Sequence, residues 1–284
     1  MFSRLLLLAA LVCCLTNCTR VDLAYRHLDV IVPWTLSDYL DMNREQKNWF
    51  NDQLKEQLRW HCSTQLPANL VWLKKVQQMV ADNQVTHERV LARTNEAKAA
   101  IADVARQITP PAVQLLQGLD DNQVRAMQQA LSEDLQKRRE EFVLPPLSTQ
   151  TNDRAKRMRK RLEPWFGTLS DSQQQRIAEW SRALGEQNRE WLDNREHWQG
   201  LFMQAVNHRH EAEFGSRMAQ LLQQRESLWT PQYQAAFART ETAGLELLVG
   251  LMADSTMAQR QHIEQKLAEL EQDFSELKCL NPSR

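Results

Sequence analysis

Apolar residues recur every three or four positions along most of the chain, separated by Gln, Glu, Arg and Lys. This spacing places them on one face of a helix and predicts amphipathic helices. The sequence shows no extended alternation of Val, Ile, Thr and Tyr bounded by turn residues, the pattern expected of a half-buried strand. Seven Gly and nine Pro among 284 residues leave few places for turns. We therefore predict an all-α fold: an elongated bundle of roughly ten helices, or two stacked bundles.

The helix boundaries follow from capping residues, prolines and the limits of the apolar spacing. The predicted helices span residues 43–61, 67–80, 86–108, 120–142, 153–166, 170–207, 210–229, 231–252 and 256–278. Residues 21–42 are expected to form one or two short helices broken near Pro33. Pro110-Pro111 should end the helix that begins at Thr86, since proline lacks the backbone donor needed inside a helix.

The best linker candidate is the segment 144–152, which contains Pro145-Pro146. It divides an N-terminal helical region, residues 43–143, from a C-terminal helical region, residues 153–284. Two helix starts, Leu119-Asp120 with Gln123 and Leu169-Ser170 with Gln173, share the spacing of a capping box. The segment Leu40-Asp41-Met42-Asn43-Arg44 breaks this spacing because Gln46 arrives late, and two copies do not establish a repeat.

The first residues have the pattern of an export signal. Arg4 precedes an apolar run, Leu5–Leu15, that is too short to span a bilayer. The following Leu15-Thr16-Asn17-Cys18 resembles a lipobox, the processing site of bacterial lipoproteins, with Asn17 where a small residue is usual. The resemblance implies a signal peptide over residues 1–17 and acylation of Cys18 by palmitate-like chains, which would anchor the segment 18–42 to a membrane. The alternative is an ordinary secretory signal cleaved without lipid.

The residue after the acylated cysteine bears on the location. By resemblance to lipoprotein sorting, Thr19 in place of Asp favours the outer membrane, with the protein facing the periplasm. No later stretch of the sequence is apolar enough to cross a bilayer, so the expected membrane attachment depends on the lipid.

Two further cysteines, Cys62 and Cys279, remain after the expected processing. In an oxidising periplasm they could form a disulfide that ties the C-terminus to an early helix. The alternative is two half-buried free thiols, because the sequence does not place their Cα atoms within bridging distance.

The largest charge anomaly is a run of six basic residues: Arg154, Lys156, Arg157, Arg159, Lys160 and Arg161. Such a cluster can bind anionic headgroups, lipopolysaccharide phosphates or an acidic partner. We favour the other interpretation, a solvated helix face paired with acids nearby in sequence. These acids are Glu133, Asp134, Glu140 and Glu141. The chain as a whole is near neutral, with 35 Lys+Arg and 36 Asp+Glu, which argues against nucleic-acid binding.

Trp180, Trp191 and Trp198 fall on one stripe if residues 170–207 form a single helix. The stripe could bind glycan or a client polypeptide, but aromatic residues at helical spacing usually fill a core, and we favour the core. The rings of His208 and His210 would point apart on a helix, and no Cys/His spacing suggests a metal site. No catalytic motif or cofactor-binding motif is present, so the sequence names no catalytic residue and no cofactor.

The mature chain resembles a family of uncharacterised proteobacterial helical lipoproteins, of the domain-of-unknown-function kind. The resemblance rests on Cys18, Tyr25, Leu28-Asp29, Pro33-Trp34, Leu36, Asp38-Tyr39, Gln46, Trp165-Phe166-Gly167 and Leu169-Ser170-Asp171-Ser172-Gln173. It brings no activity to transfer. A weaker similarity links Leu119-Asp120 with Gln123, and Leu169-Ser170 with Gln173, to the LTxxQ motif of helical periplasmic stress chaperones, although both copies lack the Thr.

These observations favour a non-enzymatic, lipid-anchored protein that binds another envelope component, with an assembly or chaperone-like role. The partner would be an envelope protein or an anionic lipid surface, and the sequence leaves the oligomeric state open. The alternatives are an envelope enzyme, such as a peptidoglycan hydrolase that uses an isolated Glu, and a structural spacer.

Overall fold

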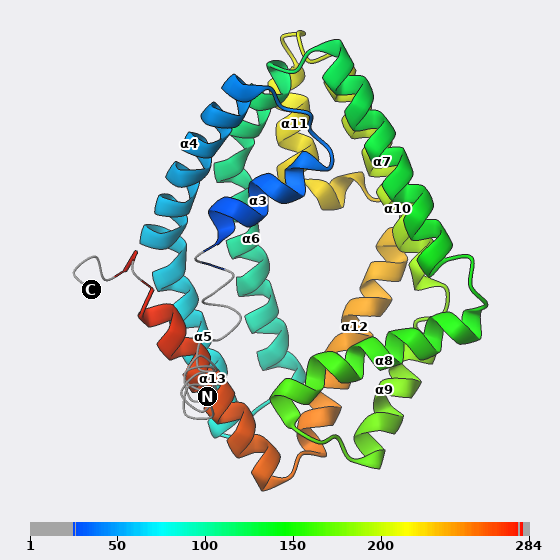
Figure 1. Cartoon of the computed structure of the whole chain (residues 1–284). Helices are drawn as coiled ribbons and strands as arrows, with labels where there is room; N and C mark the ends of the chain where they lie inside the picture. Colours follow the sequence, from blue (N-terminus) through cyan, green and yellow to red (C-terminus); the bar gives the residue numbers. More distant parts are fainter. Residues whose placement is uncertain (1–24, 26, 278, 281–284) are drawn as a thin grey trace, which may run out of the picture.

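The computed structural model describes Tyr25, residues 27–277 and residues 279–280. Within this part of the chain all regular structure is helical, so the predicted all-α, multi-helix fold is confirmed (Figure 1). In chain order the α-helices are α3 (Leu28–Ser37), α4 (Arg44–Trp60), α5 (Leu66–Ala81), α6 (His87–Gln117), α7 (Asp121–Phe142), α8 (Leu147–Phe166), α9 (Asp171–Ala183), α10 (Gln187–Asn207), α11 (Phe214–Gln223), α12 (Pro231–Ala253) and α13 (Met257–Ser275). A π-helical segment, η1 (His61–Gln65), joins α4 to α5, and a 3₁₀ turn, η2 (Arg225–Leu228), follows α11.

The helices lie around a roughly four-sided outline, with helices distant in sequence side by side (Figure 1). The last helix, α13, packs on α5, and α10 packs on α7. The helix α11 packs on α6, so helices from both sides of the α7–α8 connection contact one another repeatedly. That connection is short because α8 begins at Leu147, and residues 147–152 are helical rather than part of a linker.

Two main cores hold these helices together, and each draws on both halves of the sequence. The first includes Leu116 and Met127 from the N-terminal half, and Val206 and Phe214 from the C-terminal half. The second includes Leu73 and Val80 together with later residues such as Ile177, Leu251 and Ile263. Because neither core belongs to one stretch of sequence, removing either half would expose apolar side chains of the other.

Capping boxes begin four helices: α4 (Asn43 with Gln46), α7 (Asp120 with Gln123), α9 (Ser170 with Gln173) and α13 (Thr256 with Gln259). The interpretation that Gln46 arrives too late for this spacing is wrong, since its side chain accepts from the Asn43 backbone at 2.9 Å. The helix α13 is capped by Thr256 and begins at Met257, one residue later than predicted.

Several predicted helices differ from the structure. The break predicted near Pro33 is wrong, because α3 runs from Leu28 to Ser37 with Pro33 inside it. The helix α6 passes through Pro110-Pro111 and continues to Gln117, because Leu115 and Leu116 on its last turns are buried in the first core. The helix predicted over residues 170–207 is broken after α9, where Gly185 has a positive φ of 51° that favours glycine. The helix predicted over residues 210–229 is replaced by the shorter α11, which begins at Phe214 and ends at Gln223, and a 3₁₀ turn follows it.

Candidate functional site

The predicted signal peptide, residues 1–17, and the predicted acylation site, Cys18, lie outside the described residues. Within the described residues, each helix is too short or too polar to cross a bilayer. The described part begins at Tyr25, close to the disulfide.

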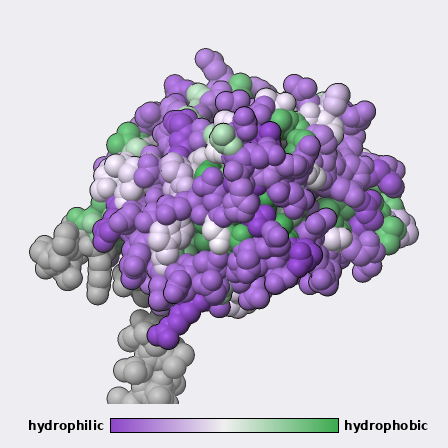
Figure 2. All heavy atoms as spheres, turned by 90° about the horizontal axis from the view of Figure 1, so that it is seen from above, coloured by the Kyte–Doolittle hydropathy of each residue, from purple (hydrophilic) through white to green (hydrophobic). Residues whose placement is uncertain are grey.

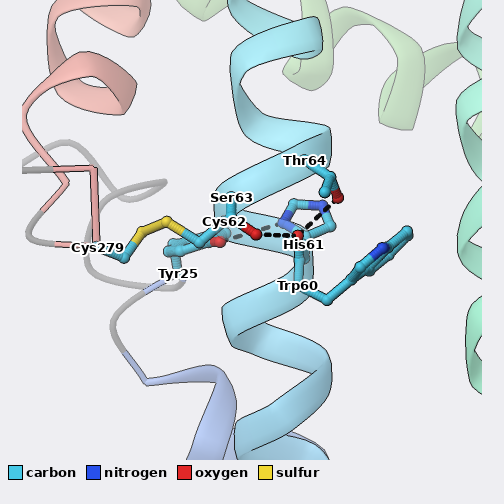
Figure 3. The surroundings of a disulfide bond; sticks show 7 residues. All are labelled: Tyr25, Trp60, His61, Cys62, Ser63, Thr64 and Cys279. Atoms are coloured by element: carbon cyan, nitrogen blue, oxygen red, sulfur yellow. Dashed lines mark hydrogen bonds between the residues drawn. A yellow bond between two sulfur atoms is a disulfide. The ribbon is translucent and has the colours of Figure 1, made fainter.

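Cys62 and Cys279 are joined by a disulfide, with their Cα atoms 6.1 Å apart (Figure 3). Cys62 lies in the π-helical segment η1 and is 3% exposed, packed with Leu66 and Leu277 in a small third core. The bond therefore fixes the chain after α13 to the junction of α4 and α5, and the surrounding apolar residues restrict access to Cys62.

Beside the disulfide, the hydroxyl of Tyr25 and Nδ1 of His61 are 3.1 Å apart (Figure 3). Burial lowers the pKa of His61 and raises the pKa of Tyr25, so both side chains favour their neutral forms at this junction. The contact holds Tyr25 against the π-helical segment η1, which carries both His61 and Cys62.

The six basic residues predicted as one surface divide into two groups. Arg154 is 6% exposed, and its guanidinium donates to the carbonyl oxygens of Ser181, at 2.8 Å, and Gly185, at 3.1 Å. Burial lowers the pKa of Arg154, and the charge of Arg157 acts in the same direction. Arg154 therefore fastens α8 to the end of α9 and does not belong to a binding surface.

The other five residues, hereafter the basic face of α8, are exposed or partly exposed: Lys156, Arg157, Arg159, Lys160 and Arg161. Arg157 lies over the ring of Phe142, 5.4 Å from its centroid. Among the described residues no ion pair joins this face to the acids that we expected to neutralise it. Asp134, for example, pairs instead with Arg138 at 2.7 Å and with Arg195 at 3.0 Å. These acids therefore do not neutralise the positive charge of the basic face, which can interact with solvent or with a partner.

The three tryptophans do not form one stripe, because the break at Gly185 places Trp180 on α9 and the other two on α10. Trp198 packs against the first core and its indole donates to the carbonyl of Leu221 at 3.1 Å. Trp180 packs against the second core, and Trp191 meets the ring of Phe142 edge-on. Each of the three rings therefore packs against other side chains, which agrees with the core role that we favoured over a binding stripe.

An apolar cavity of about 430 Å³ lies beside α3 and is lined by six helices. We call it the α3 cavity. Representative lining residues, one from each helix, are Leu36 (α3), Phe50 (α4), Leu115 (α6), Leu131 (α7), Phe202 (α10) and Leu222 (α11). Its volume falls within the range of about 300–1,000 Å³ typical of small-molecule sites.

One polar group close to the α3 cavity, but not exposed to it, has no partner. The side-chain oxygen of Gln57 is buried and accepts no hydrogen bond from any described residue. A buried acceptor that loses its bond to water costs about 1–3 kcal/mol unless something replaces that bond. The oxygen has no surface open to the cavity, so the accessible lining of the α3 cavity is entirely apolar.

The sequence could not reveal this cavity. Trp49, Phe50 and Leu54 recur at helical spacing in the sequence, but this spacing does not say which helices face them. The described residues contain no group of three or more His, Cys, Asp and Glu side chains suited to hold a metal ion.

Comparisons with known proteins give one match. A protein-family model described as a family of unknown function, DUF6279, matches residues 38–234, which include all helices from α4 to α11. Neither a curated protein nor a solved structure matches the chain significantly.

Proposed function

We propose that this chain, which belongs to the DUF6279 family of unknown function, is a lipid-anchored protein of the bacterial envelope. We further propose that it acts by binding rather than by catalysis. The anchor is an acylated Cys18, and the body faces the periplasm from the outer membrane. The role is that of an assembly or chaperone-like factor that holds an envelope component close to the membrane.

The observation that carries the proposal is the disulfide between Cys62 and Cys279. Disulfides persist in oxidising compartments such as the periplasm and are rare in the cytosol. The bond agrees with an export signal ahead of Cys18, since an exported chain would reach such a compartment.

The basic face of α8 is the surface that we propose contacts the partner. Lys156, Lys160 and Arg161 are exposed and make no ion pair with any described residue. Trp165, on the same helix, is 37% exposed and lies one turn after Arg161. Cations beside an exposed Trp suit a surface that carries anionic headgroups, because Trp prefers the boundary between apolar and hydrated layers.

Crosslinking with mass spectrometry, in cells that carry the native anchored chain, tests this function. We expect one envelope component to be recovered reproducibly, with crosslinks concentrated on Lys156 and Lys160. The control is a chain with Lys47→Arg and Lys55→Arg, which replaces exposed lysines of α4. It should still recover the same envelope component, with the crosslinks on Lys156 and Lys160. Crosslinks spread evenly over the surface, with only non-specific background, would count against the proposal.

A further inference from the structure

We propose that α8 lies along the surface of an anionic bilayer, with Leu144, Leu147 and Trp165 inserted between the headgroups and the neighbouring cations beside lipid phosphates. The proposal rests on the proposed function, because it names a bilayer as the partner of the basic face of α8. It adds a membrane contact that does not depend on an acyl anchor, and it assigns that contact to three apolar side chains.

The turn that leads into α8 exposes two leucines. Leu144 is 66% exposed and Leu147, the first residue of α8, is 43% exposed. Pro145 and Pro146 lie between them, and this connection projects at the right-hand corner of the outline in Figure 1. The surface seen in Figure 2 is mostly hydrophilic, with its apolar residues in separate patches. An apolar corner that projects from the molecule needs a matching hollow in a rigid partner, whereas a fluid layer adapts to it.

Trp165 lies on the same side of α8 as Leu147. The two positions are about five helical turns apart, which is about 27 Å along the axis. Ala155 and Phe166, on another side of the helix, are buried in the second core. Leu144, Leu147 and Trp165, hereafter the apolar edge, therefore follow the length of α8 outside the core.

Cations lie between the two ends of the apolar edge. Arg157 and Arg161 precede Trp165 by two turns and by one turn, so the three side chains form one row along the helix. The five cations of the basic face outnumber the two acids of α8, Asp153 and Glu163. The row therefore places positive charge next to exposed apolar groups.

This combination favours a bilayer over an acidic protein. An acidic protein would attract the cations, but the attraction gives no role to apolar side chains at both ends of the row. The interface of an anionic bilayer provides both parts, because phosphates attract Lys and Arg while Leu and Trp enter the boundary with the acyl chains. Trp in particular prefers this boundary.

The first described helix, α3, lies on the same side of the molecule as α8. In Figure 1 α3 crosses in front of α6, and α8 crosses in front of α12. Val30 and Trp34 of α3 are 61% and 70% exposed. Leu28, the first residue of α3, follows Cys18 by ten positions, a distance of at most about 36 Å for an extended chain. An acylated Cys18 and the apolar edge can therefore reach one flat surface together.

The mature chain with Cys18→Ser tests the contact without an anchor. The probe is a vesicle of phosphatidylcholine with phosphatidylglycerol, and co-sedimentation measures binding. Leu144→Ser with Leu147→Ser should weaken binding about tenfold, a loss of about 1.4 kcal/mol, because these side chains no longer transfer apolar surface out of water. The two changes leave the net charge as it is, so the attraction of the cations is retained.

The matched control is Val71→Ser with Ile101→Ser. These apolar residues of α5 and α6 are 56% and 68% exposed and lie outside the apolar edge. The control should bind within about twofold of the unmodified Cys18→Ser form, with the circular dichroism of all three proteins unchanged. Equal weakening in the two double variants, or no weakening in the Leu144 and Leu147 variant, would overturn the proposal.

The depth of insertion is measured with an environment-sensitive fluorophore on a single added cysteine, at Leu147→Cys or Trp165→Cys. The disulfide keeps Cys62 and Cys279 from reacting with the label. We expect a nitroxide on the lipid acyl chain to quench both labels and to leave a label at Ile101→Cys unquenched. Quenching of the α8 labels by a headgroup nitroxide alone would show that α8 stays above the apolar layer, and would overturn the insertion.

The same measurements separate this contact from the proposed function. With an amine-reactive crosslinker in cells, the component joined to Lys156 and Lys160 should be an aminophospholipid. A protein joined there, beside a Cys18→Ser form that does not bind the vesicles, would overturn the bilayer as partner and leave the proposed function standing. If Cys18 carries no lipid but the Cys18→Ser form binds the vesicles through the apolar edge, the proposed anchor fails and the contact of α8 stands.

Discussion

Gln173 and Gln259 exchange side-chain hydrogen bonds: Nε2 of Gln173 donates to Oε1 of Gln259 at 3.2 Å, and Nε2 of Gln259 donates to Oε1 of Gln173 at 3.0 Å. Each glutamine also closes the capping box of its own helix, α9 or α13. Gln46 and Gln123 form the same pair between α4 and α7. The two pairs lie at opposite ends of the molecule, where these helices begin (Figure 1).

Replacement of Gln173 by Leu should destabilise the fold by about 1–3 kcal/mol, because it leaves buried polar groups of its partners unsatisfied. Gln173 is fully buried, and it also donates to the carbonyl of Leu251 at 3.3 Å. Urea unfolding followed by circular dichroism measures the change. Gln175→Leu, at an exposed position of the same helix, is the control and should stay within about 0.5 kcal/mol. Equal stabilities of the two variants would show that the glutamine pair contributes nothing.

Removal of the disulfide should lower the free energy of unfolding by about 2–5 kcal/mol, since the bond closes a loop of 217 residues in the unfolded chain. The change is Cys62→Ala with Cys279→Ala, measured by urea unfolding. A reductant should shift the unfolding midpoint of the unmodified chain toward that of the variant and leave the variant unaffected. A midpoint that is the same with and without reductant would show that the bond does not form.

Arg154→Ala should lower the free energy of unfolding by about 1.5–3 kcal/mol, because two backbone carbonyls lose the guanidinium that donates to them. Arg161→Ala, at an exposed position of the same helix, should change stability by no more than about 0.5 kcal/mol. Thermal or urea unfolding of both variants makes the comparison. If Arg161 proved the more costly of the two, the division of the basic residues into one structural arginine and a solvent-facing group would be wrong.

Neutralisation of two exposed cations, Lys156→Gln with Lys160→Gln, should weaken binding to phosphatidylglycerol vesicles about thirtyfold, at about 1 kcal/mol for each charge. Vesicle co-sedimentation of the soluble Cys18→Ser form measures it. The control with Lys47→Gln and Lys55→Gln carries the same change in net charge on α4. Equal weakening in both proteins would mean that net charge, rather than the basic face of α8, drives the attraction.

Local signals were sufficient to predict much of the fold. The starts of α7, α9 and α12 were located correctly because Asp120, Ser170 and Thr230 cap them through contacts within one turn. The course of α6 through Pro110-Pro111 was not predictable, because burial of distant residues in the first core overrides the local preference.

The candidate site was less accessible to sequence reasoning. The charge of α8 was visible, but the sequence did not indicate that Arg154 turns inward to meet the backbone of Ser181. The α3 cavity needed six helices in place, and the partnerless oxygen of Gln57 became apparent only once its neighbours were known. Contacts between residues far apart in the chain decide both features, and no spacing within a helix records them.

The most direct test of the central claim is the mass of the N-terminal peptide of the chain purified from membranes. The account predicts a peptide that begins at Cys18 and carries the added mass of acyl chains, together with loss of membrane association in the Cys18→Ser variant. A mature N-terminus without acyl mass, in a protein found entirely in the soluble fraction, would contradict the lipid-anchored account.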